Sequence, residues 1–267
     1  MSDFRMIPCA LRATGELSFT GLALAVAWLL VLAPPSTAVA GPTAEELLNR
    51  TDDVQRGESS HGTVTMNVKT DRWDRSLTME MWTEGEDKSL IVIRSPAKEA
   101  GMATLKVDDN IWNYLPKVDR TMKVPASMMS GSWMGSHFSN DDLVKESRMA
   151  DDYTFAFTHK PSDGDANEYV IECTPKPDAP VVWGKVVVTV DGETELPTEI
   201  TYWDEKGELK RTMTFDDVKD LDGRQIPCRM KLVPADEPEE YTEVLYDDIE
   251  FDIEIPPETF TLQALKQ

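Results

Sequence analysis

The sequence predicts a mainly β protein, in which one antiparallel sheet curls into a barrel after a single helix and carries one irregular insert. Apolar and polar residues alternate along many short segments, which is the period of a strand with one buried face. Pairs such as Asp191-Gly192 and Asp222-Gly223 separate these segments and are typical of hairpin turns. No internal repeat or shift in composition marks a second domain, so we expect one domain over residues 41–267.

A helix is expected at the start of this domain. Thr43 is a suitable N-terminal cap, acidic residues follow in the first turn, and Gly57 is a suitable end. The apolar stripe between them consists of Leu47, Leu48 and Val54.

Strands are expected on both sides of the insert, because apolar residues recur there at every second position. The first two stretches centre on Val64, Met66 and Val68 and on Leu77, Met79 and Met81. The others before the insert are 88–94, 103–108, 111–115 and 119–124. Those after it are 153–159, 168–174, 182–190, 197–203, 209–215, 224–233 and 241–251.

The insert, residues 125–145, has no alternation and places large apolar residues among Ser and Gly. These residues are Met128, Met129, Trp133, Met134 and Phe138. Methionine side chains adapt to varied apolar partners, and small residues give the backbone freedom, so the insert suits a flap over a binding site. The alternative is that the same residues close the open end of the barrel permanently, as ordinary core.

Large aromatic residues lie in the predicted strands, among them Trp82, Trp112 and Tyr114. Side chains of this size commonly fill the interior of a barrel. A closed barrel of about eight strands is just filled in this way, whereas a half-open barrel of about eleven strands is wide enough to keep a cavity. We expect these three residues to line such a cavity.

The formal net charge is −22. Such a surface repels phosphate backbones and anionic headgroups, which argues against nucleic-acid binding and favours a soluble monomer. A hydrophobic ligand would then be held inside the protein. Acidity that only keeps an exported protein in solution explains the charge equally well.

Cys173 and Cys228 are the two cysteines after residue 40. In an exported protein, a disulfide between them would contribute about 4 kcal/mol in the chain-entropy model. Several predicted strands separate them, so they would not be neighbours in a simple meander. We expect them to be unpaired.

The motifs of common enzymes are absent from the sequence: it has no G-x-S-x-G, H-E-x-x-H, P-loop or Rossmann glycine pattern. His61, His137 and His159 fall on separate predicted elements, whereas a metal site needs converging ligands. His137 forms a local cluster with Asp141 and Asp142, which the cap of a helix N-terminus explains better than a metal does. We therefore expect no catalytic activity, no metal and no cofactor.

Residues 1–40 predict a secretory signal peptide. A charged start precedes the uncharged run Gly21–Ala33, and Pro34-Pro35 and the A-x-A site Ala38–Ala40 follow it. The run is shorter than the ~20 residues of a membrane span, which favours cleavage after Ala40 over an uncleaved anchor.

Three segments together resemble the outer membrane lipoprotein-sorting protein family, which is similar in fold to the periplasmic lipoprotein carrier LolA. They are Trp112–Pro116 (WNYLP), Ser132–Ser136 (SWMGS) and Asp141–Leu143 (DDL). The resemblance implies a half-open antiparallel barrel with an N-terminal helix, a short helical lid and an apolar cavity for acyl chains. It also implies a periplasmic location and membrane transporters of the RND or ABC type as partners.

The sequence departs from the family pattern at two places. Cys228 follows Pro227 where the family would have a small hydroxyl residue. No motif marks the arginine that latches the lid of the lipoprotein carrier, and Arg75 and Arg94 are the candidates by position.

The sequence thus predicts a periplasmic carrier that shields the acyl chains of a lipid or lipoprotein between inner-membrane transport machinery and the outer membrane. The alternative is a non-catalytic lipid-sensing or adaptor module of an RND-type or other envelope transport complex. A purely structural adaptor would have a filled barrel.

Overall fold

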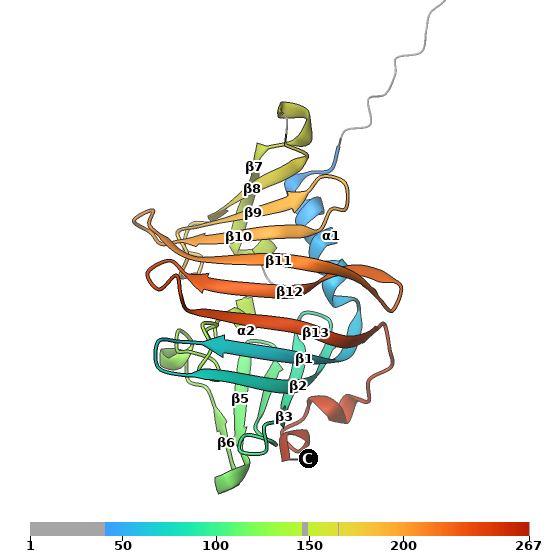
Figure 1. Cartoon of the computed structure of the whole chain (residues 1–267), viewed down its shortest axis with the longest axis vertical. Coiled ribbons are helices and arrows are strands. Elements are labelled where there is room, and N and C mark those ends of the chain that lie inside the picture. The colour runs from blue at the N-terminus through green and yellow to red at the C-terminus, as the bar shows by residue number, and fades with distance from the viewer. Residues whose placement is uncertain (1–40, 146–148, 165, 267) are drawn as a thin grey trace, which may run out of the picture. The chain divides into compact units, whose positions relative to one another are not determined.

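The segments of alternating hydrophobicity form one antiparallel sheet in the computed structural model, which describes residues 41–145, 149–164 and 166–266 (Figure 1). The sheet has 13 strands in the order β6-β5-β4-β3-β2-β1-β13-β12-β11-β10-β9-β8-β7. Its two edge strands do not pair, so the sheet is a half-open barrel. This confirms the predicted fold class, although the expected number of about eleven strands was too small.

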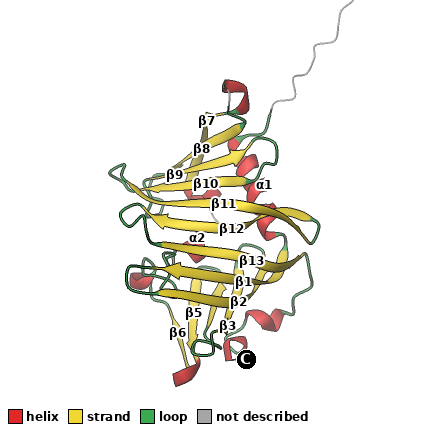
Figure 2. Cartoon of the chain, in the orientation of Figure 1, coloured by secondary structure: helices red, strands yellow, loops and turns green. Residues whose placement is uncertain are grey.

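The strands form two meanders, coloured yellow in Figure 2. The first consists of β1 (Ser59–Lys69), β2 (Asp74–Glu84), β3 (Lys88–Ser95), β4 (Ala103–Val107), β5 (Asn110–Leu115) and β6 (Arg120–Lys123). The second consists of β7 (Tyr153–His159), β8 (Glu168–Pro175), β9 (Lys185–Asp191), β10 (Pro197–Trp203), β11 (Leu209–Leu221), β12 (Arg224–Pro234) and β13 (Tyr241–Phe251).

The two meanders meet at the centre of the sheet, where β1 pairs with β13 over Ser60–Lys69 and Tyr241–Phe251. The first meander runs outward from this pair to β6, and the second begins at the opposite edge with β7 and runs inward. The segment that joins β6 to β7 must therefore connect the two edges of the open sheet.

The helices are short apart from α1 (Ala44–Arg56), which lies where the sequence predicts it. Thr43 and Glu46 cap its N-terminus reciprocally, with hydrogen bonds of 2.8 Å and 3.2 Å between the side chain of each and the backbone N–H of the other. Two α-helices of one turn, α2 (Asp142–Lys145) and α3 (Met149–Asp152), lie between β6 and β7. The 3₁₀ turns among the described residues are Pro116–Val118, Ala126–Met128, Pro161–Asp163, Pro257–Phe260 and Ala264–Lys266. None of the helices among the described residues has the length and apolar character needed to cross a membrane.

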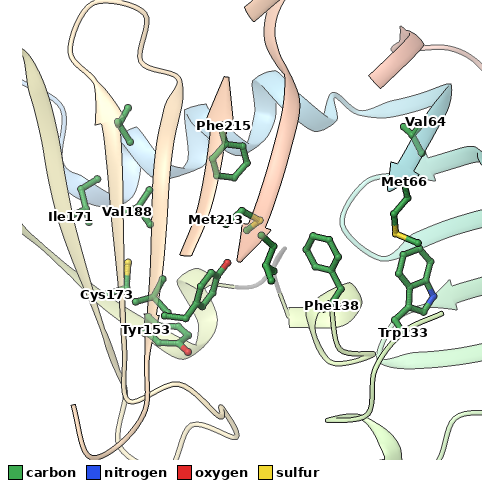
Figure 3. Close-up of a cluster of buried hydrophobic side chains, with 14 of the residues drawn as sticks. Val64, Met66, Trp133, Phe138, Tyr153, Ile171, Cys173, Val188, Met213 and Phe215 are labelled. Carbon is green, nitrogen blue, oxygen red and sulfur yellow. The ribbon is translucent and has the colours of Figure 1, made fainter. Parts of the chain in front are cut away.

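Apolar side chains are buried on both faces of the sheet. The inner face, defined here as the one that the insert covers, carries a large cluster (Figure 3). This inner cluster includes Val64, Met66, Leu77, Met79, Ile171, Val188, Met213 and Phe215 from the strands, Leu47 from α1, and Trp133 and Phe138 from the insert. The outer cluster covers β3 to β5 and consists of Leu90, Val92, Ala103, Leu105 and Tyr114 with Ile255, Phe260, Ala264 and Leu265 from the segment after β13.

Gly41–Gln267 forms one compact unit. The predicted signal peptide, residues 1–40, lies outside the described residues.

Both cysteines are free, as predicted, because they lie in different clusters. Cys173 belongs to the inner cluster, whereas Cys228 packs with Ile226, Ile249 and Phe251. Burial raises the pKa of the Cys173 thiol to about 12 and also raises the pKa of Cys228.

We predict that neither thiol of the protein starting at Gly41 reacts with iodoacetamide under native conditions at neutral pH, because the thiolate is the reactive form. Both should be alkylated in denaturant without reductant, which mass spectrometry of the labelled protein detects. Protection of both cysteines in denaturant would instead reveal a disulfide.

Candidate functional site

Residues 125–145, called the lid from here on, belong to the connection that crosses the inner face from β6 to β7. The lid folds back on itself at Ser132–Ser139, where these two serines form a β-bridge. Within this turn the backbone N–H of Trp133 donates to the carbonyl of Phe138 at 2.8 Å. The bonded pair places both aromatic side chains in the inner cluster, where Trp133 lies beside Met66 (Figure 3).

The five predicted lid residues differ in burial. Trp133 and Phe138 are only 5% and 8% exposed, and Met134 packs against the inner cluster. Met129 is half-buried, and Met128 is 59% exposed. The buried lid residues therefore form part of the core that they cover.

The side chain of Arg75, on β2, holds the lid by binding to the backbone of the lid. Its Nη1 donates to the carbonyl oxygen of Met134 at 2.9 Å, and its Nε donates to Glu99 at 3.1 Å. Met134 and Gly135 both have left-handed backbone conformations, with φ of 52° and 72°. Of the two candidate arginines, Arg75 is the one that contacts the lid, because Arg94 pairs with Glu80 on the other side of the sheet.

Two further contacts of the lid use side-chain hydrogen bonds. The indole Nε1 of Trp133 donates to the hydroxyl of Thr104 on β4 at 3.1 Å, so its polar group is satisfied inside an apolar cluster. The backbone N–H of His137 donates to the hydroxyl of Thr242 on β13 at 2.9 Å. The ring Nε2 of His137 lies 3.2 Å from a carboxylate oxygen of Glu240. These bonds tie the lid to both meanders.

His137 lies near acidic residues other than those that the sequence suggests. Its ring and the carboxylates of Glu237 and Glu240 offer atoms within 4.8 Å of one another, a spacing that a metal ion could use. In the structure, Thr242 already bonds to its Nδ1 at 2.8 Å, and Glu240 accepts the backbone N–H of Asp71 at 2.7 Å.

Asp142 instead serves in the predicted helix cap. Its carboxylate accepts the backbone N–H of Ser139 at 2.7 Å, and its own N–H donates to the Ser139 hydroxyl at 3.2 Å.

Asp142 also forms a buried ion pair with Arg211 on β11. The two guanidinium nitrogens donate to its two carboxylate oxygens at 2.8 Å and 2.6 Å. The side chains are 9% and 12% exposed. The guanidinium carbon lies 4.1 Å from the ring centre of Tyr202 and 4.6 Å from that of Trp183, so the cation packs against two aromatic rings.

Sequence reasoning missed this pair, because 69 positions separate its two members. A signal was present, since Arg211 shares the strand face of Met213 and Phe215, which alternation assigns to the core. A charge on an apolar face is rarely left without a partner.

A hollow lies beside this ion pair. A groove of about 380 Å³ opens between the lid and β11–β12 and is lined by Ser130, His137, Ser139, Asp141, Val182, Trp183, Lys210, Arg211, Leu232 and Pro234. An adjoining inner cavity of about 40 Å³ shares Asp141, Val182, Trp183 and Arg211 with it and is otherwise mainly apolar. The groove has the size of a small ligand site, whereas the inner cavity has room for little more than water.

The expected placement of Trp82, Trp112 and Tyr114 around an inner cavity requires correction. All three belong to the outer cluster or pack against it. The register explains this, because Trp82, Leu90, Leu105 and Trp112 are direct partners on adjacent strands and therefore share one face. Met81, next to Trp82, packs against the inner cluster instead.

Solved structures of similar proteins show this fold. A protein described as an outer membrane lipoprotein-sorting protein domain, from Vibrio parahaemolyticus, is 24% identical, with a TM-score of 0.72 and coverage of 84% of this chain and 100% of its own. A DUF1329 family protein from Desulfovibrio piger is 23% identical, with a TM-score of 0.74 and coverage of 83% and 97%. A LolA superfamily protein from Nitrosomonas europaea is 21% identical, with a TM-score of 0.70 and coverage of 84% and 100%. The half-open barrel is therefore a LolA-like fold.

The sequence comparison agrees with the fold. A DUF1329-like family model, described as an uncharacterized protein, matches residues 85–267, and the chain belongs to this family. No match to this chain was found among curated proteins. The expected resemblance to LolA-like proteins is confirmed.

We predict that Arg75→Ala loosens the lid, because it removes the charged donor to the Met134 carbonyl. Hydrogen exchange in residues 130–140, followed by mass spectrometry, should accelerate about ten- to a hundredfold, the range expected for one charge-assisted hydrogen bond. Arg94→Ala is the matched control and should leave this exchange unchanged. Equal acceleration in both variants would contradict the assignment.

The lid should also loosen in acid. The pKa of Glu240 is lowered from its ordinary value of 4.5, first by the N–H of Asp71 and then by His137. Because the pKa of Glu240 is lowered by its contacts with Asp71 and with the lid, its ionised form stabilises the closed lid at a pH above the ordinary pKa. This stabilisation is lost as the pH falls through the lowered pKa. Relative to the intrinsic exchange rate at each pH, exchange in the lid should rise below pH 4.5. Glu240→Gln should remove this rise and Glu250→Gln, on the exposed part of β13, should not.

Proposed function

We propose that the protein carries the acyl chains of a lipid or lipoprotein beneath the lid. The observation that supports this most is that Trp133 and Phe138 are members of the inner cluster and also belong to a segment held by a few separate bonds. Movement of the lid would expose apolar surface on the sheet. An acyl chain is a ligand that could cover it.

The energetics of exchange suit a carrier. Each methylene moved out of water contributes about 0.8 kcal/mol, so an acyl chain gains strongly from an apolar interior. Moving a buried aromatic side chain of the lid into water costs roughly 2–3 kcal/mol of hydrophobic free energy. The difference leaves a net affinity that permits release. A receptor that stabilises the open lid would then promote transfer.

The proposed setting is the periplasm, between transport machinery of the RND or ABC type and the outer membrane. The signal peptide expected in residues 1–40 and the fold shared with lipoprotein-sorting proteins support it. The protein would act there as a monomer without catalytic activity.

One observation favours the alternative, a lipid-sensing or adaptor module. The inner cavity is small while the lid is closed, about 40 Å³. A carrier should pass labelled lipid from donor to acceptor vesicles, whereas an adaptor should bind its membrane partner without transferring lipid.

The decisive first measurement is mass spectrometry of organic extracts from protein purified from its native periplasm without detergent. A stoichiometric acylated species supports the proposal. Protein that contains no lipid and takes up none from added vesicles would refute it.

We predict that Trp133→Asp abolishes lipid retention, because a carboxylate replaces the indole in the inner cluster. Trp112→Ala, on the outer face, is the control and should retain lipid. Circular dichroism should show the same strand content in both variants. Full lipid content in folded Trp133→Asp would exclude the lid from ligand binding.

A further inference from the structure

We propose that Arg211 is the binding site for an anionic headgroup, and that the cargo is an acidic amphiphile whose headgroup replaces the Asp142 carboxylate when the lid opens. This inference rests on the proposed function, because it specifies the chemistry of the same ligand. It concerns a residue of β11, distinct from the Arg75 contact with the lid backbone.

The guanidinium is held in place by the body of the protein. Arg211 and Tyr202 are paired positions on adjacent strands, and the Tyr202 and Trp183 rings pack against the cation at 4.1 Å and 4.6 Å. Neither ring belongs to the lid. Packing of this kind orients the planar fork of donors, which matches a carboxylate or a phosphate bidentately.

An anion that Arg211 binds in the closed state comes from the lid. Asp142 is the first residue of α2, and both its carboxylate oxygens accept from Arg211. Lid opening removes this carboxylate from a cation that is only 9% exposed at its side chain. Separating a buried ion pair in this way is strongly unfavourable unless another anion replaces the lost partner.

Arg211 also stands where polar and apolar surroundings meet. It lines both the groove, which Lys210 and His137 share, and the apolar inner cavity, which Met149, Tyr153 and Met213 share. A headgroup at Arg211 would therefore lie in the groove, with its chain directed into the inner cluster. This combination fits an amphiphile better than a small free anion.

The charge of the whole protein gives the buried arginine a particular role. With a net charge of −22 the surface repels acidic lipids at long range, so an acidic cargo needs a local cation inside the protein. While no cargo is bound, Asp142 supplies a carboxylate to that cation.

The test is a competition between two lipids with the same chains. The protein is incubated with vesicles of dioleoyl phosphatidylglycerol and dioleoyl phosphatidylcholine in equal parts, separated by flotation, and its bound lipids are quantified. We expect phosphatidylglycerol to exceed phosphatidylcholine by about ten- to a hundredfold, the range of a hydrogen-bonded charge. Asp142→Asn should increase the phosphatidylglycerol bound, because it removes the internal competitor.

The double variant Arg211→Gln and Asp142→Asn removes both charges of this ion pair together, so neither member is left charged without the other. It should bring the lipid ratio close to one, and Arg94→Gln on the outer face should leave the ratio as in the wild type. Uptake of both lipids equally by the wild type would overturn this inference but support the proposed function. Uptake of neither lipid would overturn both.

Glycerol phosphate is the probe for a small-anion site. It should fail to displace bound phosphatidylglycerol at concentrations at which the lipid saturates the protein. Displacement by glycerol phosphate would overturn the assignment of an amphiphile.

Discussion

The connection between the two edges of the sheet governs the rest of this structure. Because the two meanders meet at β1 and β13, the chain leaves the first at β6 and enters the second at the opposite edge, at β7. The inner face between these edges is apolar, and water cannot satisfy it. One segment therefore provides the covalent link and the cover of the inner face at once.

The cover is held by two kinds of interaction with different consequences. Apolar contacts of Trp133 and Phe138 are non-directional, so a ligand of similar chemistry can replace them. The hydrogen bonds that join the lid to Arg75, Thr104 and Arg211 are directional, so they specify one position of the lid on the sheet. A segment with both kinds of contact can exchange its partners without losing its place, which is the physical basis of the proposed carrier.

The sequence predicted where the strands lie better than it predicted which face of the sheet each side chain occupies. Hydrophobic periodicity is a local property. Alternation located the strands, and cap residues with an apolar stripe located α1, because each element buries one face along its own length. It could not tell which face of the sheet is inner, so Trp82, Trp112 and Tyr114 were expected on the wrong side of a sheet that is covered on both faces. The Arg211–Asp142 pair depends on how the lid crosses β11, which no local pattern contains. Trp133 and Phe138 could be singled out from the sequence, because large apolar residues are unusual in a run of Ser and Gly.

The bond between Arg75 and the lid is directed to a main-chain carbonyl, that of Met134. Every residue type carries this group, so exchange of the Met134 side chain leaves the acceptor unchanged. The contact constrains the path of the backbone, and Gly135, with its left-handed conformation beside the Arg75 guanidinium, is fixed by the same requirement. Substitutions of the Met134 side chain can therefore change the chemistry of this part of the segment while the contact between Arg75 and its backbone is kept.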